Sequence, residues 1–214
     1  MTKQVLRAQT KVVLRAIPQN ELQLQSRQLL QALEPIIMKY NVFGCYVNMD
    51  VAEAQTGFIL RRIFALKKSV YLPRCTSTKI TGQVPLVGNK VSHPHLTFHE
   101  VHSMEQVEDL KPSGKYGLRE PPDDGLPPLP PADIEVLLIP GVAFDLSNGG
   151  RIGHGAGFYD DYVHRCLHYN HKVPLLVGLA LKQQIVIGLP METHDEPMDA
   201  IACGDGSLHW IRRL

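Results

Sequence analysis

Three glycines at alternate positions mark the segment whose residue types and spacing are best suited to chemistry. The segment runs from Arg151 to Asp160 and reads RIGHGAGFYD. Because glycine has no Cβ and reaches positive φ, a backbone built this way can lie close to a bulky anion. Consecutive backbone N–H groups that lead into a helix N-terminus form a site for phosphate. The spacing therefore predicts a phosphate-binding loop followed by a helix that begins near Phe158.

Two well-known phosphate loops have a different spacing. A P-loop needs Gly-Lys followed by Ser or Thr, and the dinucleotide fingerprint has two residues between its second and third glycines. Upstream, the mostly apolar residues 134–139 predict a buried strand that ends in the turn Pro140-Gly141. A strand, a glycine-rich loop and a helix in this order predict a nucleotide-type ligand at the carboxyl end of a parallel sheet. An ordinary glycine-rich hairpin is the alternative.

Four aspartates are candidate magnesium ligands for such a site. Asp145 lies just before the loop, Asp160 directly after it, and Asp195 and Asp199 lie in a polar insert between two apolar strands. Mg²⁺ takes hard oxygen ligands and bridges to substrate phosphates. A single aspartate of this kind is more often an N-cap or turn residue. Together, around one end of a sheet, the four form a credible set.

Four histidines gather between residues 93 and 102. Imidazole is the commonest metal ligand. However, no HExxH frame accompanies them, and alternate strand positions explain their spacing. We therefore favour a strand without a metal.

The elements that must position these residues follow from periodicity. Helices are predicted for about the first seventeen residues, for 21–38, from a Thr56 N-cap to 65, and for 158–169, and strands for 42–47, 69–74, 95–101, 134–139, 175–181 and 201–210. Pro73 is expected to end the second strand, and the proline-rich residues 120–131 to form a stiff connector. The pattern predicts a single α/β domain over 1–214, a three-layer sandwich with a largely parallel sheet and an N-terminal helical hairpin.

Composition bounds the class of protein. With 214 residues, 44% of them hydrophobic and 20% charged, the chain has material for one globular core. A net charge of +1 argues against bulk attraction to nucleic acid. No apolar run approaches the ~20 residues of a membrane span. Four scattered cysteines without zinc spacing suggest reduced thiols and a cytosolic setting.

The N-terminal segment carries basic residues at every fourth position. Lys3, Arg7, Lys11 and Arg15 line one face of a helix, and no acidic residue precedes Glu21. The same pattern is compatible with a transit peptide.

Six motifs occur in order over nearly the whole chain: Lys3-x-x-x-Arg7, Glu53-x-x-Thr56, Leu72-Pro73-Arg74, Gly117 to Pro121, Pro140-Gly141-x-x-Phe144-Asp145 leading into Arg151 to Asp160, and the Asp195/Asp199 segment. Together these motifs resemble those of the 5-formyltetrahydrofolate cyclo-ligases (methenyltetrahydrofolate synthetases). The resemblance implies that ATP phosphorylates the formyl oxygen of 5-formyltetrahydrofolate and that N10 attacks the activated carbon. The products would be 5,10-methenyltetrahydrofolate, ADP and phosphate, and Mg²⁺ would be the cofactor.

The resemblance also implies roles for particular residues. ATP would contact Lys3, Arg7, Arg151, Ile152, Gly153, His154, Gly155, Ala156, Gly157, Phe158 and Tyr159. The folate, free or polyglutamylated, would contact Val47, Glu53, Glu120, His154, Gly155, Ala156, Gly157 and Phe158. Asp160 and Asp195 would hold Mg²⁺, and Arg151, His154 and Asp160 would be catalytic. Glu53 would accept hydrogen bonds from the pterin N–H groups as an ionised carboxylate.

The chain departs from the family pattern at three loop positions. Many members carry basic residues where His154 and Ala156 stand, so phosphate binding would depend more on Lys3, Arg7 and Arg151. Phe158 replaces a tyrosine and removes a hydroxyl. The rival interpretations are a nucleotide-dependent kinase or ligase acting on another small acceptor, and a folate-binding module without turnover. The resemblance favours a monomeric cytoplasmic enzyme that binds neither nucleic acid nor membrane, with a mitochondrial location as the alternative.

Overall fold

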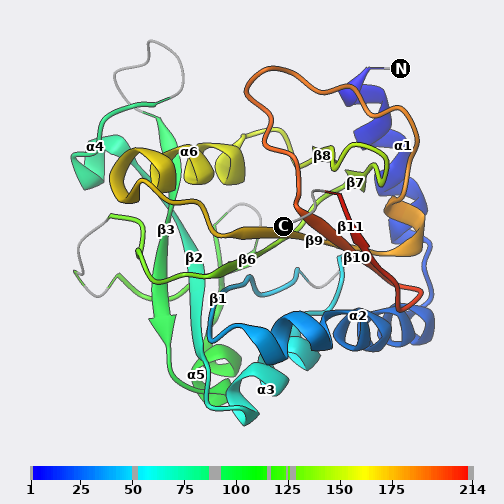
Figure 1. The fold of residues 1–214 in the computed structure, drawn as a ribbon, viewed down its shortest axis with the longest axis horizontal. Helices are drawn as coiled ribbons and strands as arrows, with labels where there is room; N and C mark the ends of the chain where they lie inside the picture. The colour runs from blue at the N-terminus through cyan, green and yellow to red at the C-terminus, as the bar shows by residue number, and fades with distance from the viewer. Residues whose placement is uncertain are drawn as a thin grey trace.

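A computed structural model describes residues 2–49, 53–86, 93–114, 117–123, 125 and 129–211 of the chain. Its centre is a seven-stranded sheet in the order β11-β10-β9-β6-β1-β2-β3 (Figure 1). These strands are β1 (Val42–Gly44), β2 (Ser69–Ser77), β3 (Pro94–Val101), β6 (Val136–Ile139), β9 (Leu175–Ala180), β10 (Ala200–Cys203) and β11 (Leu208–Trp210). The five inner strands run parallel, and β3 and β11 pair antiparallel at the two edges. The predicted largely parallel sheet is confirmed.

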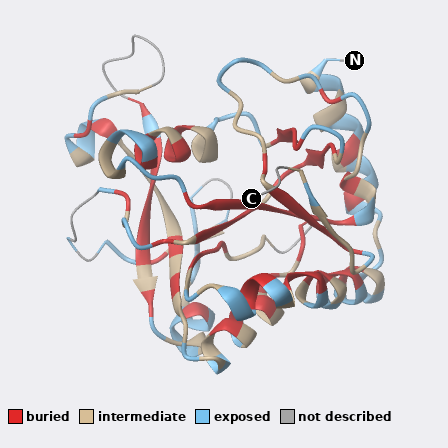
Figure 2. Cartoon of the chain, viewed as in Figure 1, coloured by how far each residue is buried: buried red, intermediate tan, exposed pale blue. Residues whose placement is uncertain are grey.

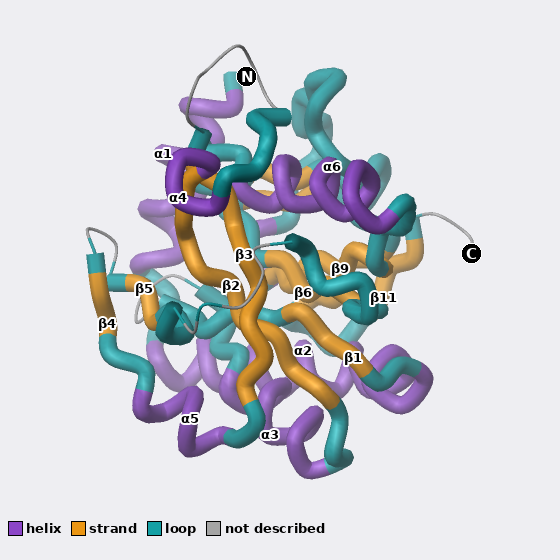
Figure 3. The backbone as a smooth tube through the Cα atoms, turned by 90° about the vertical axis from the view of Figure 1, so that its left-hand side faces the viewer, coloured by secondary structure: helices purple, strands orange, loops and turns teal. Residues whose placement is uncertain are grey.

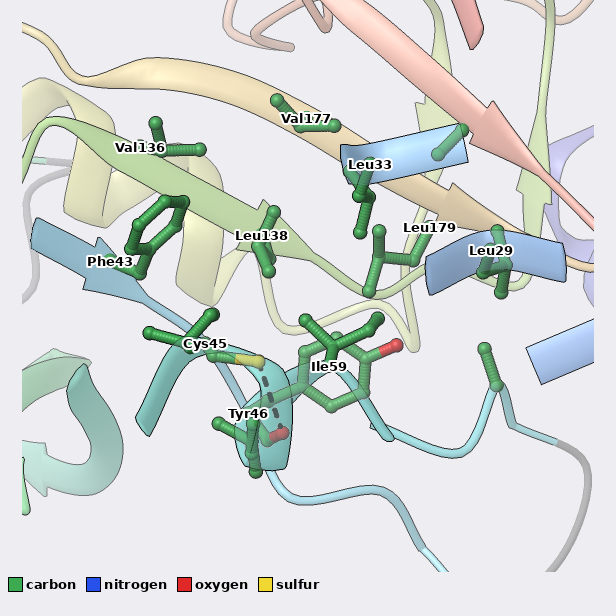
Figure 4. Packing of buried hydrophobic residues seen from close by; sticks show 14 of the residues in the cluster. Leu29, Leu33, Phe43, Cys45, Tyr46, Ile59, Val136, Leu138, Val177 and Leu179 are labelled. Atoms are coloured by element: carbon green, nitrogen blue, oxygen red, sulfur yellow. Dashed lines mark hydrogen bonds between the residues drawn. The ribbon is translucent and has the colours of Figure 1, made fainter. Parts of the chain in front are cut away.

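Helices cover both faces of this sheet. The helices α2 (Gln19–Lys39), α3 (Gly57–Ala65) and α5 (Met104–Asp109) lie on one side and α6 (Phe158–Asn170) on the other (Figure 1). Leu29 and Leu33 of α2 and Ile59 of α3 pack with strand residues such as Leu138 and Val177 (Figure 4). On the opposite face, Tyr162 of α6 stacks on Phe98 at a ring distance of 4.4 Å. The result is the predicted three-layer sandwich, with its buried residues on the strands and the inner helix faces (Figure 2).

The two expected N-terminal helices are present and contact different parts of the molecule. In α1 (Lys3–Arg15) the side chain of Thr2 caps the N-terminus. This helix packs beside the short helix η1 (Lys182–Gln184) and β7 (Ala143–Phe144), whereas α2 packs on β10 and α3. Thus α1 lies beside the segment that leads into the glycine-rich loop.

One sequence prediction needs correction. The second strand does not end at Pro73, because β2 continues to Ser77 in register with β3. Strand β1 pairs only with the first three residues of β2. Pro73 lies beyond these residues, so the N–H that proline lacks does not weaken the pairing with β1. Thr56 is the N-cap residue of α3, as predicted, and its hydroxyl donates to the Tyr46 carbonyl at 2.7 Å instead of making a side-chain capping bond.

Between β6 and α6 the chain forms a short antiparallel hairpin. Strands β7 and β8 (Arg151–Ile152) pair with each other. The carboxylate of Asp145 accepts hydrogen bonds from the backbone of Ser147 and Leu189, both at 2.9 Å, and is buried. Asp145 is therefore a turn carboxylate that fixes this hairpin. The glycine-rich loop leaves the hairpin and enters α6.

The remaining segments are α4 (Thr78–Thr81) and a two-stranded ribbon of β4 (Pro112–Ser113) and β5 (Leu118–Arg119). All four cysteines are unpaired, as expected. Residues 124 and 126–128 of the predicted connector lie outside the described residues. Among the helices that the structure describes, none combines the length and apolarity that crossing a bilayer requires.

Candidate active site

The backbone of the glycine-rich loop adopts conformations that glycine reaches most readily. Gly155 has φ +112° and Gly157 has φ +68°, and Gly157 is the N-cap of α6. Residues 154–157 are exposed. Because α6 begins at Phe158, its free N–H groups and the positive end of its dipole lie at the end of the loop. The predicted order of strand, glycine-rich loop and helix is therefore present, with β8 rather than β6 as the strand that enters the loop, and anion binding by the loop stays a prediction.

Helix α1 brings its cations to this loop. The Arg7 Nε donates to the Gly153 carbonyl at 2.9 Å, and its guanidinium carbon lies 3.8 Å from the position that a Cβ on Gly155 would take. Partial withdrawal from water, together with the charges of Lys11, Arg7 and Arg151, lowers the pKa of His154. His154 therefore stands among positive charges and is neutral at physiological pH in the free protein.

Arg151 lies under the loop with little exposure. Its Nη2 donates to Asp160 Oδ2 at 2.8 Å and its Nη1 to the Pro140 carbonyl at 3.4 Å. The guanidinium carbon lies 5.7 Å from the centre of the Tyr159 ring. The buried Nε has no hydrogen-bond partner among the described residues. Arg151 thus keeps one donor available at the base of the loop.

Lys3 and Asp195 form the second ion pair. Lys3 Nζ lies 2.5 Å from Asp195 Oδ2 and 3.5 Å from Glu192 Oε2. Asp195 also accepts the backbone N–H of Glu192 at 2.6 Å. Burial opposes ionisation of Asp195, but the hydrogen bonds from Lys3 and Glu192 outweigh it and lower its pKa. The carboxylate is therefore ionised at neutral pH.

A backbone hydrogen bond links the segment that holds Asp195 to Asp160, the other predicted metal ligand. The Glu196 N–H donates to Asp160 Oδ1 at 3.1 Å, and Glu196 Oε1 lies 2.8 Å from His164 Nε2 on α6. Glu192, His194 and Asp195 also present ligand atoms within 4.8 Å of one another. These partly exposed oxygens suit a Mg²⁺ that keeps water and phosphate ligands. In the free protein Asp160 and Asp195 each have a cationic partner instead.

On the other side of the loop, Glu53 is a buried carboxyl. Its exposed fraction is 7%, and its Oε2 accepts the Met49 N–H at 2.8 Å. Burial raises the pKa of Glu53 to about 7. The charge of Glu53 in turn contributes to the raised pKa values of the Tyr46 and Tyr159 hydroxyls, after burial. The charge of Glu53 thus acts on the Tyr159 hydroxyl, and the Tyr159 ring also lies near the Arg151 guanidinium.

Tyr46 points its ring among the side chains of the core (Figure 4). Its buried hydroxyl has no hydrogen-bond partner among the described residues. Val47, the next residue, is half-buried and packs against the same core. Val47, three residues after the end of β1, thus offers a half-buried apolar side chain.

Glu120 is held to strand β2. Its Oε1 accepts the Cys75 N–H at 2.9 Å, while Arg74 Nη1 donates to the Pro121 carbonyl at 2.7 Å. Burial, followed by the effect of Glu120, raises the pKa of Cys75 to about 12. Cys75 in turn contributes to the raised pKa of Tyr159. Glu120 is therefore fixed beside Cys75 on β2.

The predicted residues thus fall into two sets. Around the loop lie Lys3, Arg7, Arg151, His154, Asp160 and Asp195, whereas Val47, Glu53 and Glu120 stand on the segments that follow β1 and β5. Phe158 is half-buried against the core face of α6, and Ile152 is buried in β8. Sequence reasoning missed Lys11, Glu192, Glu196 and His164 as members of the site. Only Lys11 carried a signal, its helical spacing after Lys3 and Arg7.

Comparison with known proteins agrees with this geometry. The profile of the 5-formyltetrahydrofolate cyclo-ligase family matches residues 1–204. The chain is 44% identical over 216 residues to the 5-formyltetrahydrofolate cyclo-ligase of Saccharomyces cerevisiae, with 99% of each chain covered. It is 26% identical over 211 residues to that of Mus musculus, with 95% of this chain and 94% of the relative covered.

Solved structures share the fold. The 5,10-methenyltetrahydrofolate synthetase of Aquifex aeolicus superimposes with a TM-score of 0.69 at 22% identity, covering 100% of this chain and 95% of the other. The synthetase from Mycoplasma pneumoniae gives 0.61 at 18%, covering 94% and 98%. The chain belongs to the 5-formyltetrahydrofolate cyclo-ligase family and is an enzyme of that class. The family inferred from the six motifs is confirmed.

Proposed function

We propose that this chain closes 5-formyltetrahydrofolate to 5,10-methenyltetrahydrofolate, using ATP and Mg²⁺ and releasing ADP and phosphate. The observation that carries the ATP site is the contact of Arg7 with the Gly153 carbonyl, which places the cationic face of α1 on the glycine-rich loop. Family membership supports the folate substrate. The contact of Arg7 and the family membership are independent lines of support.

The chemistry divides into two transfers. The formyl oxygen attacks the γ-phosphorus of ATP, the bond from that phosphorus to the bridging oxygen breaks, and ADP leaves. N10 then attacks the formyl carbon and loses its proton. The carbon–oxygen bond breaks, and the former formyl oxygen leaves as part of inorganic phosphate. Phosphorylation is needed because an amide-like oxygen is otherwise a poor leaving group.

Phosphoryl transfer requires positioning and neutralisation of charge more than covalent chemistry by the protein. Lys3, Arg7 and Arg151 would neutralise phosphate oxygens, and the N–H groups of the loop and of the first turn of α6 would donate to them. His154, neutral in the free protein, gains a proton more easily once a polyanion lies beside it. It would then replace the basic side chain that many relatives carry there.

The two ion pairs of the free site would exchange partners when ligand binds. Asp160 and Asp195 would hold Mg²⁺, which supplies Lewis-acid polarisation of the phosphate oxygens. Lys3 and Arg151, which now neutralise these carboxylates, would turn to the phosphates. Each charge keeps an opposite partner throughout, so ATP and metal are expected to bind together.

On the folate side, Glu53 would accept hydrogen bonds from the pterin N–H groups and Val47 would contact the ring. Tyr159, whose ring lies near the Arg151 guanidinium, would separate the reacting formyl group from water. A buried carboxylate is destabilised unless it accepts hydrogen bonds. Glu53 should therefore favour a ligand that brings hydrogen-bond donors.

The direct test is to mix the protein with 5-formyltetrahydrofolate, ATP and Mg²⁺ and to follow the near-ultraviolet band of the methenyl product. We expect the band to grow only when ATP and metal are both present. Growth without ATP would contradict the phosphorylation step. A flat trace despite folate binding would favour a binding module without turnover. ATP hydrolysis driven only by another acceptor would favour the rival enzyme class.

A further inference from the structure

Residues 192–196 form a polar segment that bridges helices α1 and α6, in the orange loop before β10 (Figure 1). The Asp195 N–H donates to the Glu192 carbonyl at 3.0 Å and closes a turn. Beyond the turn, the Met198 N–H donates to the Gly149 carbonyl at 2.9 Å. The chain is thus tied down after the segment, and the position of Asp195 depends on the contacts that the segment itself makes.

Side chains of two helices hold this segment. Among the described residues, those of other elements that form hydrogen bonds or ion pairs with it are Lys3 on α1 and Asp160 and His164 on α6. Lys3 and Asp160 are residues that would exchange partners when ATP and Mg²⁺ bind. The contact of His164 with Glu196 includes no proposed metal ligand and no phosphate-binding cation. It can therefore persist through that exchange.

Helix α6 holds Glu196 at two points. Asp160 and His164 are four residues apart, so they lie on the same face of the helix. Asp160 Oδ1 accepts the backbone N–H of Glu196 at 3.1 Å, and His164 Nε2 lies 2.8 Å from Glu196 Oε1. Because a carboxylate oxygen only accepts, Nε2 is the donor in this hydrogen bond. The backbone and the side chain of Glu196 are thus both fixed to one helix face.

The helix is itself fixed to the sheet. It lies against β3 on one face of the sheet (Figure 3). Tyr162 and Val163 of α6 are buried in one cluster with Phe98 of β3. His164 follows Val163 and is partly exposed, with 31% of its side chain accessible. A side chain bonded to His164 is therefore positioned relative to the packed sheet.

We propose that His164 and Glu196 are a positioning pair that holds Asp195 beside Asp160 for Mg²⁺. This inference rests on the proposed function, because it takes both aspartates as metal ligands. Asp195 directly precedes Glu196, so fixing Glu196 to α6 limits how far apart the two aspartates can move. Once Asp160 turns to the metal, its bond to the Glu196 N–H weakens, and the bond to His164 keeps the segment in place. His164 acts through Glu196 and touches neither the nucleotide nor the metal.

The alternative role for Glu196 is to supply charge or a ligand to the metal. Among the described residues, the ligand atoms within 4.8 Å of one another are those of Glu192, His194 and Asp195. Glu196 is outside this group, and its carboxylate is bonded to His164. A positioning role needs a hydrogen-bond acceptor on this side chain, whereas an electrostatic role needs its negative charge. Substitution by glutamine keeps an acceptor oxygen and removes the charge, so it separates the two roles.

The experiment measures the dissociation constant of ATP by calorimetry with Mg²⁺ in excess. His164→Ala and Glu196→Ala should each raise this constant about threefold to tenfold, because residues that orient metal ligands matter for metal affinity and this pair is partly exposed. The double variant should raise it no further than either single change, because both changes break the same contact. Glu196→Gln should stay within about twofold of the unaltered chain, because the acceptor remains.

Two controls show that the effect belongs to the nucleotide and the metal. The dissociation constant of 5-formyltetrahydrofolate, measured without nucleotide, should be the same in all variants, because neither His164 nor Glu196 is among its proposed contacts. His168→Ala changes an exposed histidine one turn further along α6 and should leave both dissociation constants unchanged. The melting temperature of each ligand-free variant shows that the chain is folded.

The outcomes separate the two proposals. Additive losses in the double variant would show that His164 and Glu196 act independently and would overturn the pair. A loss in Glu196→Gln as large as that in Glu196→Ala would assign Glu196 an electrostatic role and would overturn the pair too. Unchanged affinity for ATP in every variant would do the same and leave the proposed function standing. If the unaltered chain does not bind ATP with Mg²⁺, the nucleotide and metal assignments of the proposed function fail, and the pair is overturned with them.

Discussion

At the scale of single residues, the site of the free protein consists of charges that neutralise one another. Lys3 pairs with Asp195, and Arg151 pairs with Asp160. All four side chains are at most 16% exposed, so leaving one of them without a partner would cost more than an exposed pair gains. The proposed exchange with ATP and Mg²⁺ keeps each charge compensated. The same residues can therefore be a stable part of the free protein and a binding site.

Glu53 gives the clearest prediction at this scale. Its pKa of about 7 means that the carboxyl is half protonated near neutral pH in the free protein. The pterin N–H groups bind the ionised form, so affinity should be constant above pH 7 and fall up to tenfold per pH unit below it. Calorimetric titration of folate between pH 5.5 and 8.5 checks this. Glu53→Gln should weaken binding and remove this pH dependence, whereas the exposed control Glu105→Gln should retain it. A pH-independent affinity in the unaltered chain would contradict the assignment.

At the scale of elements, helix α1 is the part that most directly joins sequence to site. Its four-residue spacing of Lys3, Arg7 and Lys11 was enough to predict that these side chains share a face. The alternating glycines were likewise enough to predict a loop that ends in a helix. These features are local, and local periodicity is what a sequence displays.

Other features of the site depend on contacts that no local pattern encodes. The segment with Asp195 reaches α6 only because β10 lies where the sheet order puts it, and Glu196 then meets Asp160 and His164. The continuation of β2 through Pro73 depends on where β1 ends. The burial of Glu53 depends on the packing of the residues around it. Such features follow from long-range packing and were not predictable from spacing.

Helix α1 also carries the second prediction. Deleting residues 1–10 should leave a folded protein, because the buried Leu14 remains to pack on the core. Activity should be lost, because Lys3 and Arg7 are removed from the loop. Circular dichroism measures the fold, and the rate of methenyl formation measures activity.

The double variant Lys3→Gln with Arg7→Gln keeps helix α1 and removes two of its charges, so it separates the effect of the charges from the effect of losing the helix. It should raise the KM for ATP at least tenfold, since each lost contact to a charged group is worth about 1.5–3 kcal/mol. Arg15→Gln changes an exposed cation in the last turn of the same helix and should change little. Full activity of the deleted chain would show that α1 is dispensable, as a removable leader would be.

At the scale of the whole molecule, the proposed site joins segments from most of the chain. Residues from α1, the end of β1, β8, the start of α6 and the segment before β10 all contribute. A ligand that contacts these segments together stabilises the native state against unfolding as a unit. Ligand-dependent thermal stability therefore reports on the site as a whole.

The third prediction is that ATP raises the melting temperature only when Mg²⁺ is present. Without metal, a nucleotide would place its phosphates beside Asp160 and Asp195 with no cation between them. At a ligand concentration one hundred times Kd the stabilisation is about 2.7 kcal/mol, which for a chain of this size corresponds to roughly 5–11 °C. Asp195→Asn should abolish the shift measured from its own ligand-free melting temperature, while the exposed control Asp109→Asn should retain it. An equal shift with and without metal would contradict the assignment of Mg²⁺ to the site. No shift in either case would contradict the assignment of ATP. Because the shift needs no turnover, it tests the nucleotide and metal assignments separately from the folate chemistry.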